Sequence, residues 1–122
     1  MENVRRQYVL PDIKDCEFFA LSPQNSAILV KNGDKQIDVL DGDTLDLAFS
    51  MKVDQPKCVY LAQKLIFVGT WNCVLNIYDV GKDFKLIKTL KTKAGVRTIC
   101  EFDRHHIVCG ENEGWVDVIR FS

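Results

Sequence analysis

The sequence predicts an all-β chain of short antiparallel strands, and three observations lead to this prediction. One pattern, an apolar run followed by a polar turn and an alternation of apolar and polar residues, occurs at 28–41, 66–79 and 107–120. In each copy, nine positions separate two branched aliphatic residues: Ile28 and Ile37, Ile66 and Leu75, and Ile107 and Val116. No segment of useful length has the helical period of about 3.6 residues, so repeated strands are the better interpretation.

The strands of the first unit follow from composition and turn signals. A short strand at residues 5–11 ends at Pro11, which has no amide hydrogen to donate. Aromatic residues at 16–20 and the apolar run at 27–30 predict the next two strands. An Asn-Gly turn then leads into an alternating strand at 36–41, which is a hairpin signal. Residues 45–52 are mixed in composition, as expected for a partly solvated fourth strand.

The second and third units repeat this order. We expect strands in the second unit at 58–62, 65–69, 74–79 and 84–91, and in the third at 98–102, 106–110 and 115–122. A repeated unit of four antiparallel strands is the blade of a β-propeller. The chain is therefore predicted to be one domain, residues 1–122, with blades at about residues 12–52, 53–93 and 94–122.

The repeats resemble the WD-repeat β-propellers, whose blades carry a glycine, a small hydroxyl residue, an Asp-Gly turn, an aliphatic strand and a terminal Trp-Asp. The corresponding residues here are Gly69, Thr70, Asn72, Cys73, Tyr78 and Asp79 in the second copy, Gly110, Glu113, Gly114, Ile119 and Arg120 in the third, and Asp34, Lys35, Leu40 and Asp41 in the first. The repeats are degenerate, because the family's buried set of His, Ser/Thr, Asp and Trp is incomplete in every copy. The resemblance implies a non-catalytic interaction or scaffold module that binds a peptide or protein on its loop face.

Three blades are too few to close a ring, because propellers have about four to eight. The third unit lacks a fourth strand, and the resemblance implies that residues 4–11 supply it. We expect two chains to meet head to tail, each amino-terminal strand completing the other's last blade, in a six-bladed ring with two-fold symmetry. The alternatives are that the sequence is a piece of a longer propeller or that it pairs with a different protein.

Composition excludes several classes of function. The 16 basic and 17 acidic residues give a net charge of −1, which offers no electrostatic reason to bind nucleic acid or an anionic membrane. The amino terminus lacks the apolar core of a secretory signal, and no apolar run approaches the length of a membrane span. We therefore expect a cytoplasmic protein without a membrane span.

No metal, cofactor or catalytic site is predicted. The five cysteines form no C-x-x-C pair, and the adjacent His105 and His106 point to opposite faces of a strand. The sequence has no phosphate-binding glycine loop and no hydrolase or metalloprotease motif. Cys16, Cys58 and Cys100 are spaced by 42 residues, which we interpret as equivalent, buried positions of the repeat.

The candidate partner-binding residues lie on the turns and loops of one face. Trp71 occupies the tip of the second blade's central turn, where an exposed aromatic residue is a good anchor for a partner. Packing against the neighbouring blade is the alternative for Trp71, and the preferred role for Trp115. A polar rim is expected around Trp71 from Asn72, Lys57, Arg97, Glu111 and Asn112, unless these residues are polar only because water reaches turns.

The turn residues and a run of lysines can each be interpreted as structural or as functional. Asp34, Asn72 and Glu113 match the family's turn carboxylate, and the resemblance implies that they bond backbone amides of the turn. A ligand-binding or enzymatic site in the central channel would have to use the same three residues. The lysines at 82, 85, 88, 91 and 93 are interpreted as protection of an edge strand, with phosphoinositide binding as the alternative.

Overall fold

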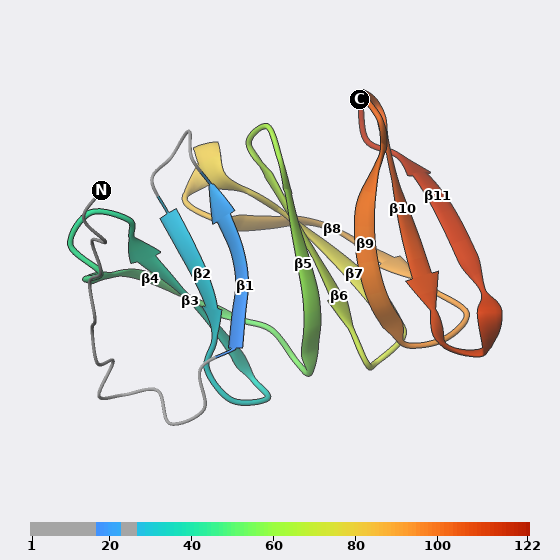
Figure 1. The fold of residues 1–122 in the computed structure, drawn as a ribbon, viewed down its shortest axis with the longest axis horizontal. Coiled ribbons are helices and arrows are strands. Elements are labelled where there is room, and N and C mark those ends of the chain that lie inside the picture. The colour runs from blue at the N-terminus through green and yellow to red at the C-terminus, as the bar shows by residue number, and fades with distance from the viewer. Residues whose placement is uncertain (1–16, 23–26) are drawn as a thin grey trace, which may run out of the picture.

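The computed structural model describes residues 17–22 and 27–122, with side chains from residue 27 onward. The described residues form three antiparallel sheets, and strands follow one another in sequence order within each sheet (Figure 1). The first sheet contains β1 (Glu17–Ser22), β2 (Ala27–Lys31), β3 (Gln36–Asp41) and β4 (Leu47–Lys52). The second contains β5 (Pro56–Ala62), β6 (Leu65–Thr70), β7 (Val74–Asp79) and β8 (Lys85–Lys91). The third contains β9 (Val96–Asp103), β10 (His106–Glu111) and β11 (Val116–Arg120).

The sheets stand side by side, with the second between the other two. Figure 1 shows β1, β5 and β9, the first strand of each sheet, as neighbours in the middle of the molecule, and β5 contacts both β1 and β9. Two short 3₁₀ helices interrupt the connections, η1 (Val80–Lys82) and η2 (Asn112–Gly114). Each sheet thus places its first strand innermost, which is the arrangement of blades around an axis.

Two hydrophobic clusters hold the sheets together. Because successive side chains of a strand point to opposite faces, β6 sends Ile66 and Val68 toward the first sheet and Phe67 toward the third. Ile66 packs with Ile37 of β3, and Phe67 packs with Ile107 of β10. All five side chains are fully buried, and burying each contributes about 1.5–3 kcal/mol. The second sheet is therefore covered on both faces, which explains its near-continuous apolar strands.

The strand pairing confirms the three predicted hairpins. Ile28 pairs with Leu40, Ile66 with Tyr78, and Ile107 with Ile119, so the three isoleucines occupy equivalent positions. The prediction that the fourth strands are partly solvated is also confirmed, because most residues of β4 and β8 are exposed. The amino-terminal strand expected at 4–11 lies outside the described residues, and so does Cys16.

The predicted equivalence of the cysteines is wrong. Cys58 pairs with Gly69, whereas the equivalent glycine of the third sheet, Gly110, pairs with Thr98. Cys100 instead pairs with Val108 and is exposed, so it is not a buried small residue. The hairpins set the register of each sheet, and the spacing between hairpins differs from the spacing between cysteines.

The edge of the third sheet is open at β11, since no fourth strand pairs with it among the described residues. The first two sheets each have such a strand, β4 or β8, in antiparallel register with the third strand. Within the same part of the chain, no helix is long and apolar enough to span a membrane.

Candidate partner-binding surface

The turns between second and third strands lie next to the loops that join the sheets, and together they form one surface, here called the loop face. Gln55 of the first connecting loop donates its amide hydrogen to the carbonyl of Asp34 at 2.6 Å and accepts one from the amide of Trp71 at 3.0 Å. In the second connecting loop, the carbonyl of Gly95 accepts the amide hydrogen of Asn112 at 2.9 Å. Backbone hydrogen bonds therefore fix the turns of all three sheets relative to the connecting loops.

Trp71 is held in one orientation on this face while 39% of its surface remains exposed. One contact is with Gly95, where an added Cβ would lie 2.7 Å from Cε3 of the indole, so only glycine lets the ring lie this close to the loop. The ammonium nitrogen of Lys57 lies 5.3 Å from the ring centroid, within cation–π range. Trp71 therefore packs on the connecting loop at Gly95, as the packing alternative predicted, and part of its ring also reaches solvent.

Asp54, which the sequence interpretation did not single out, ties two turns together. One carboxylate oxygen accepts a hydrogen bond from Nζ of Lys35 at 2.6 Å, and the other accepts one from Nδ2 of Asn72. The hydrogen bond from Lys35 holds the pKa of the Asp54 carboxyl below its usual value, and Asn72 acts in the same direction. An aspartate in a connecting loop has no distinctive signal in the sequence, because the partners of Asp54 come from turns 18 and 19 residues away.

Arg97 and Asn112 lie beside Trp71 on the third sheet. The guanidinium of Arg97 donates to Oδ1 of Asn112 at 3.4 Å. A Cβ at Gly95 would lie within 3.0 Å of Nδ2 of Asn112 and still closer to Trp71, so both side chains converge on this glycine. The structure therefore brings together five of the six predicted partner-binding residues: Lys57, Trp71, Asn72, Arg97 and Asn112.

The prediction for Glu111, the sixth of these residues, is wrong. Glu111 is buried and does not form part of an exposed polar rim around Trp71. Its side chain is 6% exposed, and Oε1 accepts hydrogen bonds from the amides of Lys93 at 3.0 Å and Ala94 at 3.3 Å. Oε2 is buried and has no hydrogen-bond partner among the described residues. Burial raises the pKa of the Glu111 carboxyl above its ordinary value, and the neighbouring Asp117 raises it further.

The predicted turn residues do not bond turn amides through their side chains. Asn72 donates to Asp54, and the amide of Asn72 is itself bonded by Oγ1 of Thr70 at 3.2 Å. Asp34 is exposed and forms an ion pair with Lys31 at 3.8 Å. Glu113 is exposed with φ of 66°, and its side chain has no hydrogen bond within the described part of the chain. In the second turn, the hydroxyl of Thr70, two residues before Asn72, accepts the hydrogen bond of the turn amide instead, so the match to the family's carboxylate does not carry over its role.

Trp115 departs from its expected packing role. Nearly half of it is exposed, and the ammonium of Lys93 lies 5.7 Å from its ring centroid. The third sheet lacks an outer neighbour among the described residues, which leaves this indole uncovered. The loop face consequently presents two aromatic rings, each paired with a lysine.

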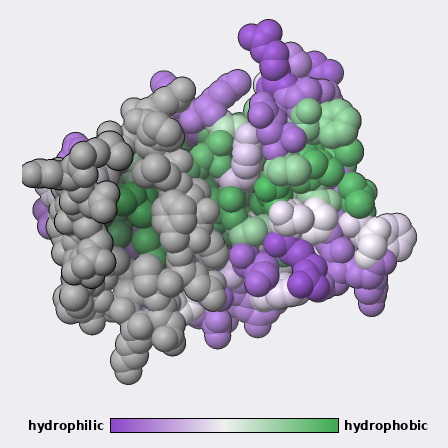
Figure 2. All heavy atoms as spheres, in the orientation of Figure 1, coloured by the Kyte–Doolittle hydropathy of each residue, from purple (hydrophilic) through white to green (hydrophobic). Residues whose placement is uncertain are grey.

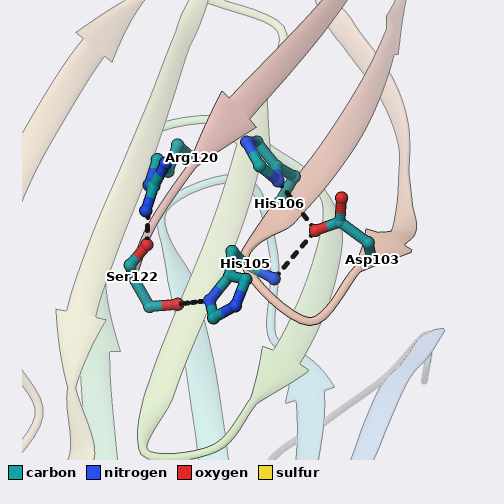
Figure 3. Close-up of polar contacts among 5 residues, drawn as sticks. All are labelled: Asp103, His105, His106, Arg120 and Ser122. Carbon is teal, nitrogen blue, oxygen red and sulfur yellow. Dashed lines mark hydrogen bonds and ion pairs between the residues drawn. The ribbon is translucent and has the colours of Figure 1, made fainter.

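The two histidines lie at the turn between β9 and β10 and have separate partners (Figure 3). Oδ1 of Asp103 contacts Nδ1 of His106 at 2.7 Å and accepts the amide hydrogen of His105 at 2.8 Å. The His105 ring contacts Oγ of Ser122 at 2.7 Å, and Arg120 donates to the Ser122 carbonyl at 2.8 Å. Among the residues with described placement, no three His, Cys, Asp or Glu side chains are grouped so that they could hold a metal ion.

Comparison with solved structures identifies the architecture. The chain superposes on BamB from Moraxella catarrhalis with a TM-score of 0.70 at 16% identity, covering 86% of this chain and 31% of that one. The computationally designed Ika4 protein gives 0.72 at 16% identity, with coverage of 87% and 67%. Hsv2 from Kluyveromyces lactis gives 0.63 at 17% identity, with coverage of 88% and 34%. All three are β-propellers.

The fold is that of β-propeller blades. The predicted all-β fold of three blades is confirmed, and the chain spans about a third of the length of BamB and of Hsv2. No protein-family model matches the sequence, and no curated protein matches it. At 16–17% identity these similarities show the fold alone.

Proposed function

We propose that this chain is a non-catalytic interaction or scaffold module, of the WD-repeat kind, that binds a peptide or protein on its loop face. The observation that supports the proposal most is the state of Trp71, which is oriented by Gly95 and Lys57 and is still 39% exposed. An aromatic side chain fixed before binding loses little conformational entropy when a partner covers it. Interface residues with the largest energetic effect are often tryptophan and arginine, and Arg97 lies on the same surface.

The polar residues around Trp71 provide hydrogen-bonding capacity of both kinds. Asn112 and Asp54 offer acceptor oxygens, while Lys57 and Arg97 carry exposed or half-exposed cations. Backbone groups of an extended or looped peptide need both donors and acceptors, so this rim is suited to a peptide. A module of this type needs no cofactor, and we place it in the cytoplasm.

Peptides selected from a displayed random library on the wild-type chain provide the test. Trp71→Ala and Arg97→Ala should each weaken binding of the selected peptide at least about tenfold, as expected for central interface residues. Phe49→Ala is the matched control, because Phe49 is also 39% exposed but lies on the outer strand β4. Equal affinities of the two loop-face variants and the wild type would remove this surface from consideration.

We also propose that two copies of the chain assemble into one propeller, because one face of the third sheet is bare. Val116 is 62% exposed, whereas its equivalents Ile37 and Leu75 in the other sheets are fully buried. Val118 and Phe102 are also largely exposed, and Figure 2 shows hydrophobic side chains at the surface over the region of the third sheet. In the other two sheets, this face is covered by the next sheet of the chain.

A second copy can cover the bare face by the packing that the chain already uses. The second sheet packs on the first, and the third packs on the second, in the same order and orientation. Repeating that step places the first sheet of a partner on the third sheet of this chain. In the same way, the first sheet of this chain packs on the third sheet of the partner, which closes a ring of six sheets with two-fold symmetry.

A further inference from the structure

Lys57, Lys93 and Arg97 are cations of the loop face that have no carboxylate partner within the described part of the chain. The ammonium of Lys57 lies over the ring of Trp71, and the ammonium of Lys93 likewise lies over an indole. The guanidinium of Arg97 donates a hydrogen bond to the neutral amide of Asn112. The ion pairs between described residues all involve other cations. These three positive charges are therefore available to a partner.

Most carboxylates of the same face already have partners. Asp54 accepts hydrogen bonds from an ammonium and from an amide, and Asp34 lies 3.8 Å from the ammonium of Lys31. Glu111 is buried, with one oxygen on two backbone amides. Glu113 is exposed and has no hydrogen bond or ion pair among the described residues. The charge that the loop face presents to a partner is therefore mainly positive, although the net charge of the chain is −1.

Two of these cations lie beside the indole of Trp71. The ammonium of Lys57 is 5.3 Å from the ring centroid. Arg97 is reached through the loop at Gly95, where an added Cβ would lie 2.7 Å from Cε3 of the indole and 3.0 Å from Nδ2 of Asn112, the residue to which Arg97 donates. A ligand that covers the exposed part of the ring therefore has an ammonium and a guanidinium at its margin.

Both cations have the capacity to bind a carboxylate. A guanidinium carries five N–H donors in a planar fork that matches a carboxylate, and Arg97 uses one nitrogen, Nη1, in a hydrogen bond of 3.4 Å. Lys57 is half-exposed, and its contact with the indole restricts the side chain before a ligand arrives. Hydrogen bonds from such cations to carboxylates are stronger than those between neutral groups.

We propose that the partner of the loop face is an acidic peptide, which covers Trp71 with an apolar side chain and places Asp or Glu carboxylates on Lys57 and Arg97. The inference rests on the proposed peptide-binding function and adds the chemical class of the peptide. Lys93 extends the same surface, because it is two residues from Gly95 and the Cα atoms of these residues are therefore at most about 7 Å apart.

A nucleic acid or an anionic membrane matches this surface less well than an acidic peptide does. Both present closely spaced phosphates, and their binding depends on neutralising many of them with basic residues. The exposed carboxylate of Glu113 lies on the turn next to Asn112 and would repel such a continuous negative surface. A peptide carries its carboxylates at separate residues, so its sequence can place them on the cations and avoid Glu113.

The test uses the peptides selected on the wild-type chain, synthesised with a fluorophore and measured by fluorescence anisotropy. We expect these peptides to be rich in Asp and Glu, and replacement of those residues by Asn and Gln should weaken binding at least about tenfold. Lys57→Gln and Arg97→Gln should each cause a similar loss, which shrinks when the peptide lacks its carboxylates. Lys64→Gln is the matched control, because Lys64 is exposed in the β5–β6 turn at the opposite end of the second sheet. Glu113→Gln should leave binding unchanged or strengthen it.

The possible results separate the class of the peptide from the proposed function. Peptides that need Trp71 but are not enriched in Asp and Glu, and that bind Lys57→Gln and Arg97→Gln as tightly as the wild type, would overturn the acidic class and leave peptide binding in place. Equal competition by a thymidine oligonucleotide or by phosphatidylserine vesicles would overturn it in favour of a phosphate-bearing partner. If no selected peptide depends on Trp71, both the acidic class and the proposed function are overturned.

Discussion

At the scale of single residues, the loop face depends on one close contact between a glycine and an indole. Gly95→Ala places a methyl group 2.7 Å from Cε3 of Trp71, so the ring must move off the loop. We expect a loss of about 1–3 kcal/mol in unfolding free energy and a shift in Trp71 fluorescence, measured in a Trp115→Phe background. Gly81→Ala is the control, because its nearest atom would be 3.3 Å away, and equal effects of the two substitutions would contradict the contact.

Glu111 determines a pH dependence of stability. Its pKa is raised in the folded protein, chiefly by burial and then by Asp117 on β11, although the amides of Ala94 and Lys93 act in the opposite direction. Between the ordinary and the raised pKa the folded state binds more protons than the unfolded state, so stability falls as pH rises through this window.

Glu111→Gln should remove this dependence, because its amide can donate to Asp117 as Asn32 donates to Asp38. We expect the variant to be more stable than the wild type at about pH 8, by about 1 kcal/mol, with a smaller difference at about pH 5. Urea unfolding at fixed protein concentration measures this, with Glu113→Gln on the exposed neighbouring turn as the control. A difference between Glu111→Gln and wild type that does not change with pH would contradict the explanation.

At the scale of elements, the fourth strands stabilise their sheets partly through single hydroxyl groups. Ser50→Ala leaves the buried carboxylate of Asp38 with one donor fewer and should cost about 1.5–3 kcal/mol. Thr89→Val removes a bond to the neutral, half-buried Asn76 and should cost only about 0.5–1.5 kcal/mol. Chemical unfolding of both variants checks this order, and a larger loss for Thr89→Val would show that the two positions are not equivalent.

Most elements were predictable from the sequence because they depend on local patterns. The three hairpins follow from apolar alternation around polar turns, and the exposed outer strands follow from mixed composition. Burial across elements was not predictable in the same way. Glu111 sits in an acidic turn by sequence, yet the connecting loop at Lys93 and Ala94 encloses it. Trp115 looked like a packing residue, but no outer neighbour covers it in the described structure.

The candidate site was predictable in part for the same reason. Trp71 was found from its place at the tip of a turn, which hairpin geometry determines. Asp54 was missed, because its importance comes from Lys35 and Asn72, which are distant in the sequence and converge only when two sheets pack. The 42-residue cysteine spacing was misleading, since the register follows the hairpins and places Cys100 two pairs further along its strand than Cys58.

At the scale of the whole molecule, the second sheet shows what a completed blade requires. It has four strands and is covered on both faces, whereas the third has three described strands, an open edge and a bare face that includes Val116. An uncovered apolar face and an unpaired edge together favour association. We propose that a second copy covers the bare face through the packing already present between the chain's own sheets.

The mass of the 122-residue chain in dilute solution tests this central claim most directly. The chain has a mass of 14.0 kDa, and we predict a stable species of about 28 kDa, the two-fold ring of two copies. Analytical ultracentrifugation over a range of concentrations gives this mass without assumptions about shape. A soluble species that remains at 14.0 kDa across that range would contradict the two-copy propeller.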